Sequence, residues 1–405
     1  MLLFRGLLSA AGVAATALPR VPLHSSATAL LYVSSYAGTI TTLNLTVPGA
    51  NTTEASLLPI ASTTGCAPNP SWLTLDYPNS VLYCLDEGLS TPNGTLSSYK
   101  TSVDGSLVQL DKVNTISGPV SAVIYGACGR GLALAEYSGS SFASYDISNP
   151  GALTPVQAQT FSIPHPGPNP SRQDAPHPHE AVVDPTGRFL LVPDLGADLV
   201  RVFLINQASL GWTPIAPLTA PPGSGPRHIA WLVTKEKTFM YLVTELGNTI
   251  LGYEVVYNKN DTLSFAQVYA SSTHGKGNTV PAGATAAEVH LSPDSKFLMV
   301  SSRGEAAFLI PNFDPKNSTK IPSDSIISFS VDHQTGNLSL VQIFPAGGMV
   351  PRQFSVNKAG TLLAVGLQND GRAVVIDRDT ETGLLKGFVA AADIVGQVTS
   401  VIFDE

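Results

Sequence analysis

The stretch HPHEAVVDPTGRFLLVPDLGAD, residues 177–198, contains two apolar runs separated by the turn-forming sequence DPTG. Two apolar runs around such a turn predict a β-hairpin. Polar residues bracket this hairpin, with His179 before its first strand and Asp194 at the end of its second. The same layout recurs along the chain, so we interpret the hairpin as one unit of an internal repeat.

Five further stretches share this layout, and they occupy residues 70–88, 120–139, 226–248, 287–305 and 351–371. Further strand-like segments follow each stretch, so a unit holds about four short strands. The interval between units varies from 48 residues, between His179 and Arg227, to 64 residues, between Glu288 and Arg352. A seventh unit is split between residues 30–38 and the lone strand at 398–403. This period predicts an all-β, seven-bladed β-propeller over residues 30–405, closed by N- and C-terminal strands that share one blade.

The first strand of each blade lines the central channel of a propeller, so the bracketing residues should surround one mouth of that channel. The predicted ring contains His179, Asp194, Arg227, Glu245, Glu288, Arg303, Arg352 and Gln368, with Glu87 and Glu136 across the channel. Burying ionisable groups is costly unless they pair or bind something, so this cluster indicates a functional site. The alternative is that these charges only form salt bridges between neighbouring blades.

Composition and the first residues restrict the class of protein further. The 405 residues are 43% hydrophobic and 13% charged, with a formal net charge of −8 and no cluster of Lys and Arg, which argues against a nucleic-acid partner. Residues 1–17 read as a signal peptide, with Arg5 before a short apolar run, and 18–29 form a short N-terminal segment. We therefore expect a secreted protein, extracellular or in the cell wall, without a membrane span. Six sequons predict solvent-facing glycosylation sites at Asn44, Asn51, Asn93, Asn260, Asn317 and Asn337.

The cysteines and histidines suggest few further sites. A disulfide between Cys66 and Cys84 is our preferred pairing, although three unpaired thiols, with Cys128 as the third, are the alternative. His177 and His179 have the spacing of metal ligands on a strand, but no third ligand is obvious, so we expect no metal and no cofactor. By register, His228 and His290 should point away from the mouth and bond within their own blades.

The motifs HPHEAVVDPTG, GPRHIAW with VTELGN, SPDSKFLMVSSRG and VPRQFSVNKAG resemble the seven-bladed propeller lactonases. That family includes bacterial 6-phosphogluconolactonases and a fungal carboxy-cis,cis-muconate cyclase. The resemblance implies that His179, Arg227, Glu245 and Arg303 are catalytic and that Arg352 occupies another recurrent position. We assign substrate binding to the remaining candidates, which are Arg352, Asp194, Glu288, Gln368 and His177.

The resemblance leaves the reaction open. Two arginines suit a small carboxylate or lactone substrate, and His179 or Glu245 would move a proton. Export favours metal-independent hydrolysis of a sugar-acid-type lactone formed outside the cell. The alternatives are a muconate-cyclase-type lactonising isomerase and a secreted adhesin without activity, because the fold alone does not fix the function. The sequence does not indicate the oligomeric state.

Overall fold

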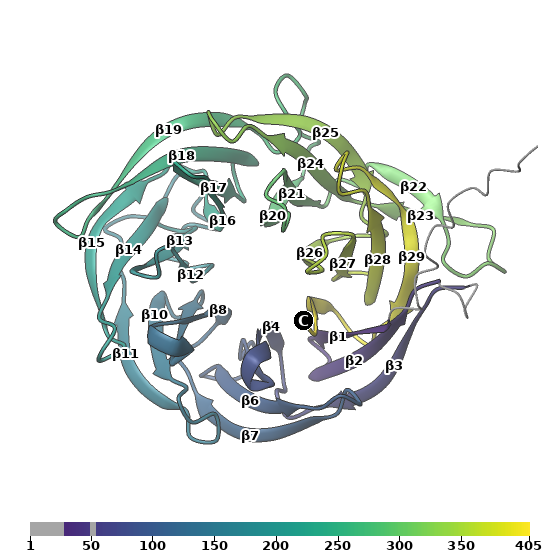
Figure 1. Cartoon of the computed structure of the whole chain (residues 1–405), viewed down its shortest axis with the longest axis horizontal. Coiled ribbons are helices and arrows are strands. Elements are labelled where there is room, and N and C mark those ends of the chain that lie inside the picture. Colours follow the sequence, from purple (N-terminus) through teal and green to yellow (C-terminus); the bar gives the residue numbers. More distant parts are fainter. Residues whose placement is uncertain (1–27, 49–53) are drawn as a thin grey trace, which may run out of the picture.

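The computed structural model describes residues 28–48 and 54–405, and it forms a ring of seven four-stranded antiparallel sheets around a central channel (Figure 1). The predicted seven-bladed propeller is confirmed. The predicted signal peptide, most of the short N-terminal segment and the sequon at Asn51 lie outside the described residues.

We number the blades from 1 to 7 along the chain and give each blade's strands in order from the channel outward. Blade 1 contains β30 (Val398–Phe403), β1 (Thr28–Ser35), β2 (Thr39–Thr46) and β3 (Ser56–Thr63). Blade 2 contains β4 (Pro70–Asp76), β5 (Val81–Asp86), β6 (Thr95–Thr101) and β7 (Leu107–Asn114). Blade 3 contains β8 (Pro119–Tyr125), β9 (Gly131–Glu136), β10 (Ser141–Asp146) and β11 (Thr154–Thr160). Blade 4 contains β12 (Val182–Val183), β13 (Phe189–Asp194), β14 (Leu199–Ile205) and β15 (Trp212–Thr219). Blade 5 contains β16 (Pro226–Val233), β17 (Thr238–Thr244), β18 (Thr249–Tyr257) and β19 (Leu263–Ser272).

Blade 6 contains β20 (Thr285–Leu291), β21 (Phe297–Arg303), β24 (Ser325–Val331) and β25 (Leu338–Pro345). Blade 7 contains β26 (Pro351–Val356), β27 (Leu362–Leu367), β28 (Arg372–Arg378) and β29 (Leu385–Asp393). An extra hairpin of β22 (Phe308–Pro311) and β23 (Lys320–Ser323) interrupts blade 6 and lies outside the ring near blade 7 (Figure 1). Two short 3₁₀ turns, η1 (Tyr77–Asn79) and η2 (Ala127–Gly129), lie in the first hairpins of blades 2 and 3.

Blade 1 closes the ring as predicted, because the C-terminal strand β30 pairs with β1 near the start of the chain. The hydroxyl of Thr399 donates to the carbonyl oxygen of Pro70 in blade 2 at 2.7 Å and lies 2.9 Å from the hydroxyl of Ser34. The closure therefore covers the inner edge of β1, which would otherwise be free to pair with another chain.

Apolar packing between blades forms the core. Seven hydrophobic clusters of described residues each span the boundary between two neighbouring blades, with residues such as Phe189 and Leu242 at the boundary of blades 4 and 5. All six residues of β13 are buried, because both faces of this strand are covered. Short, continuous apolar runs are the sequence pattern of such strands.

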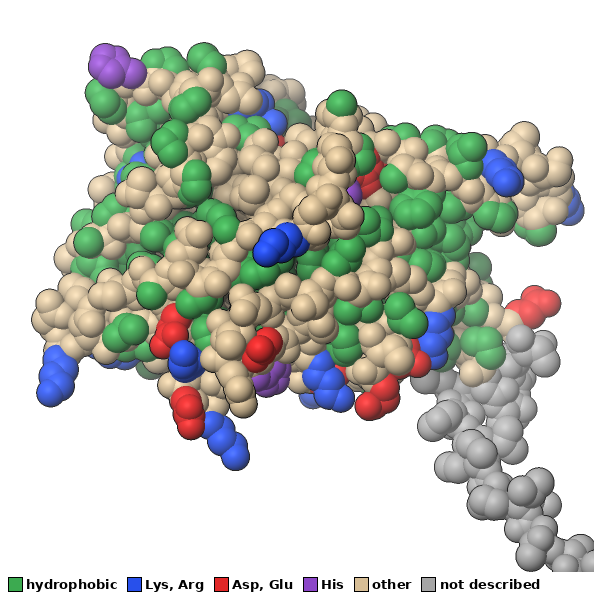
Figure 2. Space-filling model, turned by 90° about the horizontal axis from the view of Figure 1, so that it is seen from above, with side chains coloured by type: hydrophobic (Ala, Val, Ile, Leu, Met, Phe, Trp, Pro, Cys, Tyr) green, Lys and Arg blue, Asp and Glu red, His purple; other side chains and the backbone are tan. Residues whose placement is uncertain are grey.

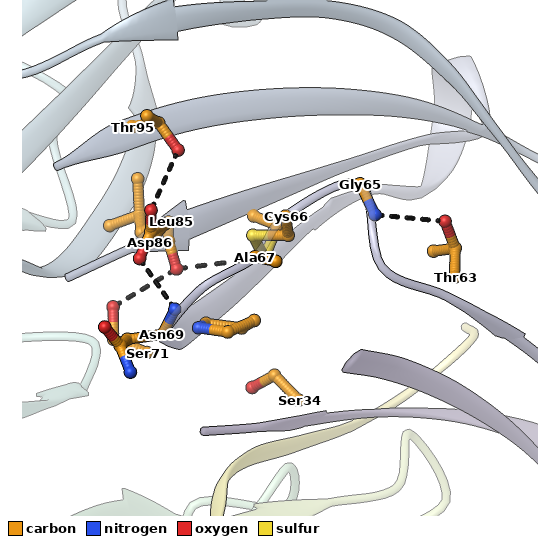
Figure 3. Close-up of a disulfide and its surroundings, with 12 residues drawn as sticks. Ser34, Thr63, Gly65, Cys66, Ala67, Asn69, Ser71, Leu85, Asp86 and Thr95 are labelled. Carbon is orange, nitrogen blue, oxygen red and sulfur yellow. Dashed lines mark hydrogen bonds between the residues drawn. A yellow bond between two sulfur atoms is a disulfide. The ribbon is translucent and has the colours of Figure 1, made fainter. Parts of the chain in front are cut away.

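Cys66, before β4, and Cys84, in β5, form the preferred disulfide within blade 2 (Figure 3). Cys128 is free and exposed. The sequon residues Asn93, Asn260, Asn317 and Asn337 are exposed as predicted, whereas Asn44 lies within β2, paired on both sides and only partly accessible. The prediction that Asn44 occupies a solvent-facing loop is therefore wrong.

Figure 2 shows Lys and Arg scattered among neutral and acidic side chains on the side of the ring, without a basic patch on that face. Within the described part of the chain, no helix has the length and apolar character to cross a membrane.

Candidate active site

Several of the residues that enter the channel mouth follow a proline near the start of the inner strand. In blades 2, 3, 5 and 7 this proline pairs with the end of the second strand, and the register then shifts by one residue. A β-bulge of this kind re-aims the side chain that it contains. The re-aimed residues in blades 5 and 7 are Arg227 and Arg352, and His179 has the equivalent place after Pro178, which forms an isolated bridge with Asp194.

A cavity of about 200 Å³ lies at this mouth. Its lining comes from blades 2 to 7 and from the loop over residues 161–181, and consists of Glu87, Val120, Tyr137, Arg172, His179, Arg227, Glu245, Arg303 and Arg352. The structure thus brings together all four residues predicted to be catalytic, together with Arg352. A larger hollow of about 650 Å³ lies on the outer strands of blades 1 and 7, but its lining is largely apolar and holds no such cluster of charges.

Glu245 is the centre of the site, because three arginines surround its carboxylate. Arg227 Nε and Arg303 Nη2 lie 2.9 and 3.0 Å from Oε2, and Arg172 Nη2 lies 2.6 Å from Oε1. Burial alone would raise the pKa of Glu245, but the charges of Arg303, Arg227 and Arg172 outweigh burial and hold this pKa well below its ordinary value. Glu245 therefore remains ionised and is a poor carrier of protons at neutral pH.

His179 has the opposite electrostatic environment. Its Nε2 lies 3.9 Å from Glu245 Oε2, too far for a hydrogen bond. Burial lowers the pKa of His179 well below its ordinary value, and the charge of Arg227 lowers it further. The imidazole is therefore neutral at physiological pH and has a lone pair available as a base.

Arg227 supplies a hydrogen-bond donor that no protein atom uses. The residue is only 2% exposed, and its Nη1 has no partner in the described protein. Burial lowers the pKa of Arg227 to about 10, a value at which the guanidinium is still charged at neutral pH. An unpaired charged donor at the wall of a cavity is suited to an anionic or developing anionic oxygen.

A second polar group occupies the opposite wall. Arg352 Nη1 donates to the hydroxyl of Tyr36 at 2.9 Å, and the Tyr36 hydroxyl donates to Glu87 Oε2. Arg352 Nη2 lies 3.7 Å from the same carboxylate oxygen. Burial raises the pKa of Tyr36 to about 12, so its hydroxyl keeps its proton. Three blades are thereby joined at the mouth.

Sequence reasoning missed Arg172 and Tyr137. Arg172 lies on the loop over residues 161–181 and reaches Glu245, and its Nη2 also lies 3.5 Å from the Tyr137 hydroxyl. A loop residue has no strand register to reveal it, so only its charge in a Pro-rich segment before the H-P-H motif could have indicated Arg172. Buried Gln173 anchors the loop through the carbonyl oxygen of Leu195 at 3.0 Å.

Tyr137 was missed for a different reason, which is an error of one residue in the predicted register. In blades 2 and 3 the prolines pair with Asp86 and Glu136, so the next residues, Glu87 and Tyr137, face the cavity. A one-residue shift exchanges the two faces of a strand. Glu136 instead accepts hydrogen bonds from Ser141 and Ile116 within blade 3, and burial raises its pKa to about 7.

The same shift accounts for Asp194, which is not part of the cavity lining. Its carboxylate accepts from the backbone NH groups of His177 and Ala197 and from Arg201 Nε at 2.8 Å. Every oxygen of this carboxylate is engaged in fixing the turn, which leaves it no role in contacting a substrate.

Three more predicted substrate-binding residues, His177, Gln368 and Glu288, also lie outside the cavity lining, whereas Arg352 is part of it. His177 stacks on Tyr137 with ring centroids 4.2 Å apart and bonds to its carbonyl oxygen. Gln368 bonds to Gln397. Glu288 accepts from His228 Nδ1 at 2.8 Å, deeper in the channel. His177 thus positions a lining residue, whereas Gln368 and Glu288 have no contact with the cavity.

The prediction that His228 bonds within its own blade is wrong, because its partner Glu288 belongs to blade 6. His290 lies 4.0 Å from Glu288 and packs its ring against Phe354 of blade 7. Across residues 28–48 and 54–405, no group of three His, Cys, Asp or Glu side chains is arranged to hold a metal ion.

The fold and the site together define a propeller that carries a cationic pocket with a neutral base at one channel mouth. The chain belongs to the family described as "Lactonase, 7-bladed beta-propeller", whose model matches residues 30–403, and it is a lactonase-family enzyme. The resemblance seen in the sequence is thus confirmed.

Named relatives agree with this assignment. The "Probable 6-phosphogluconolactonase" of Arthroderma benhamiae is 33% identical over 315 residues, which cover 78% of this chain and 75% of that protein. The 6-phosphogluconolactonase of Bacillus subtilis is 26% identical over 78% of this chain and 82% of that protein. Among solved structures, the periplasmic gluconolactonase of Pseudomonas aeruginosa has a TM-score of 0.76 at 26% identity and covers 93% of this chain and 99% of that one.

Proposed function

We propose that this protein hydrolyses a small sugar-acid-type lactone outside the cell, by metal-independent acid–base catalysis at the channel mouth. The observation that carries the proposal is the pairing of a neutral imidazole, His179, with the unpartnered Arg227 Nη1 at one small cavity. A lactone hydrolase needs a base for water and a donor for the oxygen that becomes negative, and these two groups supply both.

In this mechanism Arg227 polarises the lactone carbonyl and stabilises the tetrahedral oxyanion. One such donor is worth roughly 10²–10³ in rate. Its guanidinium is held in place by Glu245 through Nε, and its Nη1 has no partner in the described protein. Arg303 adds positive charge from the next blade and is itself fixed by a bond from Nη2 to the carbonyl oxygen of Ala286 at 2.9 Å.

His179 removes the proton from the attacking water and returns it to the leaving ring oxygen. The contribution of such a general base is roughly 10²–10⁴ in rate. Glu245 does not compete for this role, because its three arginines keep it ionised. Its negative charge, 3.9 Å away, favours the imidazolium that forms in the transition state.

The charge of the cavity supports an anionic ligand. Four arginines and two carboxylates line it, which gives a formal charge of +2 with His179 neutral. Such a field attracts an acid product or a lactone that carries an anionic group, and it repels a metal cation. Arg352 and Arg172, on opposite walls, are placed to contact ring substituents rather than the carbonyl.

Two observations support a location outside the cytoplasm. The Cys66–Cys84 disulfide is of a kind that persists in oxidising compartments. A structurally similar gluconolactonase from Pseudomonas aeruginosa is described as periplasmic. Both agree with the signal peptide that the first 17 residues predict.

The test is an assay of the purified protein with a panel of aldonolactones, phosphorylated and not, following acid release in the presence of a chelator. Turnover that survives chelation and falls at least 100-fold in His179→Gln supports the proposal. Cyclisation of 3-carboxy-cis,cis-muconate, read as loss of ultraviolet absorbance, would instead assign an isomerase. Absence of both activities in folded protein would favour a binding protein on the same fold.

A further inference from the structure

Two buried polar residues lie beneath the cavity and have no part in the mechanism described so far. His228 follows Arg227 on β16, and Glu288 lies on the neighbouring inner strand β20. Their side chains are 1% and 3% exposed. Ionisable groups are rarely placed in such surroundings without a purpose, because burial is costly to their charged forms.

The bond between these residues fixes the tautomer of His228. Burial alone would raise the pKa of Glu288, but its contact with His228 and the charge of Arg227 outweigh burial and lower this pKa, so Glu288 is ionised and only accepts hydrogen bonds. His228 Nδ1 lies 2.8 Å from Glu288 Oε1 and must therefore carry a proton. Burial lowers the pKa of His228, which leaves the ring neutral, with a lone pair on Nε2.

That lone pair has no partner in the described protein, and neither does Nδ1 of His179. The two rings lie edge to face with their centroids 5.2 Å apart. The structure shows no hydrogen bond between these two nitrogens and neither atom is open to water, but the rings are close enough that a small rotation would bring the nitrogens together. With the two nitrogens in contact, the buried acceptor of His228 and the buried nitrogen of His179 are both satisfied when His179 carries its proton on Nδ1.

We infer that Glu288 and His228 are positioning residues that hold His179 in the tautomer with Nδ1 protonated and Nε2 free. Nε2 is the nitrogen that faces Glu245 across the cavity, so this tautomer presents the lone pair where the mechanism requires a base. The inference rests on the proposed role of His179. It also moves Glu288 from the substrate-binding set predicted from the sequence to a supporting position.

The surrounding charged groups do not supply an alternative partner for His179 Nδ1. Arg227, Arg303 and Arg352 act on His179 only through unfavourable charge and offer donors rather than acceptors. Glu180 accepts from the backbone NH of Ile229 at 2.7 Å, and burial and the charge of Glu288 raise its pKa well above the ordinary value. Tyr137 packs against His179 edge to face.

The decisive variants are His228→Asn and Glu288→Gln. An Asn side chain can still donate to Glu288 but offers no acceptor at the position of Nε2. We expect His228→Asn to lower kcat by about 10- to 100-fold with KM within twofold, since loss of a group that orients a catalytic imidazole acts on the chemical step. Glu288→Gln removes the charge that orders both rings and should lower kcat similarly.

The matched control is His274→Asn. His274 is also a buried imidazole bonded to a carboxylate, Glu305, at 2.8 Å, but it lies outside the cavity lining. We expect its kcat to stay within twofold of wild type. Circular dichroism and the thermal midpoint establish that each variant is folded.

A direct readout is the ¹⁵N NMR spectrum of histidine-labelled protein, with the His179 signals assigned from their loss in His179→Gln. We expect an Nδ1-protonated His179 in the wild type and a shift toward Nε2 protonation in Glu288→Gln and His228→Asn. An Nε2-protonated His179 in the wild type, or unchanged tautomers and kcat in both variants, would overturn the inference. If His179→Gln itself retains full turnover, the proposed base is wrong, and that result is distinct from failure of the positioning role alone.

Discussion

Replacing Glu245 by Gln tests whether one carboxylate holds the site together. The substitution keeps the shape of the side chain but leaves Arg172, Arg227 and Arg303 without the charge that all three contact at 2.6–3.0 Å. At about 3 Å and an effective dielectric constant of about 20, each contact is worth roughly 5 kcal/mol of attraction. Burial of the charges and repulsion among the arginines cancel much of this sum.

Breaking a buried ion pair by removing one partner typically costs about 3–5 kcal/mol. We expect the lower part of this range, because Arg172 is 38% exposed and can turn to solvent. The measurement is the free energy of unfolding from urea denaturation at pH 7. Asp393→Asn is the matched control, because this carboxylate has one arginine partner, Arg372 at 2.8 Å, and its side chain is 77% exposed, so the substitution should cost less than about 1 kcal/mol.

The pH dependence supplies a second readout of the same charge. The folded-state pKa of Glu245 lies below the ordinary value of 4.5, so its stabilisation is present above about pH 4.5 and is lost as the pH falls toward the folded-state pKa. The difference in unfolding free energy between wild type and Glu245→Gln should therefore become smaller in acid. A loss of unfolding free energy below 1 kcal/mol in Glu245→Gln at pH 7 would refute this view of the network. A difference from wild type that does not change on acidification would refute it as well.

Three further predictions concern the base, the loop and the disulfide. Because the pKa of His179 lies well below 6.5, kcat/KM for the lactone substrate should stay level from pH 8 to below 6.5 and decline only in acid. A decline of kcat/KM already centred above pH 7 would exclude a neutral His179 as the base. Arg172→Ala should raise KM about tenfold with a smaller change in kcat, since Arg172 is placed at the wall rather than at the carbonyl. If that placement were wrong, steady-state kinetics would show an equal fall in kcat and in kcat/KM. Replacing Cys66 and Cys84 together by Ser should lower the unfolding free energy by about 3 kcal/mol, as a closed loop of 18 residues suggests, and calorimetry in a reducing buffer should show no such difference from wild type.

The propeller could be predicted from the sequence because its blades repeat one hairpin. Turn sequences such as DPTG between apolar runs identify the hairpins, and the split between the two ends of the chain identifies the closing blade. The site was predictable where a proline precedes the functional residue, as at His179, Arg227 and Arg352. At these positions the pairing of the proline with the second strand, and the bulge that follows it, determine which side chain faces the mouth.

The second strands were harder to place, because their last polar residue can be assigned to either of two neighbouring positions. Asp194 and Glu136 carry charge yet fix turns, while Tyr137, the residue after Glu136, faces the cavity. Arg172 was beyond prediction, since the course of a 21-residue irregular loop depends on tertiary contacts such as that of Gln173 with Leu195. A local pattern in the sequence contains no record of such contacts.

The pairing of β30 with β1 also has a consequence for biosynthesis. Tyr36, which joins Arg352 to Glu87, belongs to the blade that only the final strand completes. While the chain is still emerging from the ribosome, blade 1 lacks β30, so the blade that carries Tyr36 at this wall of the pocket is incomplete. A prematurely terminated product that ends before residue 398 would lack the innermost strand of blade 1, so competence for catalysis should appear only once β30 has been made.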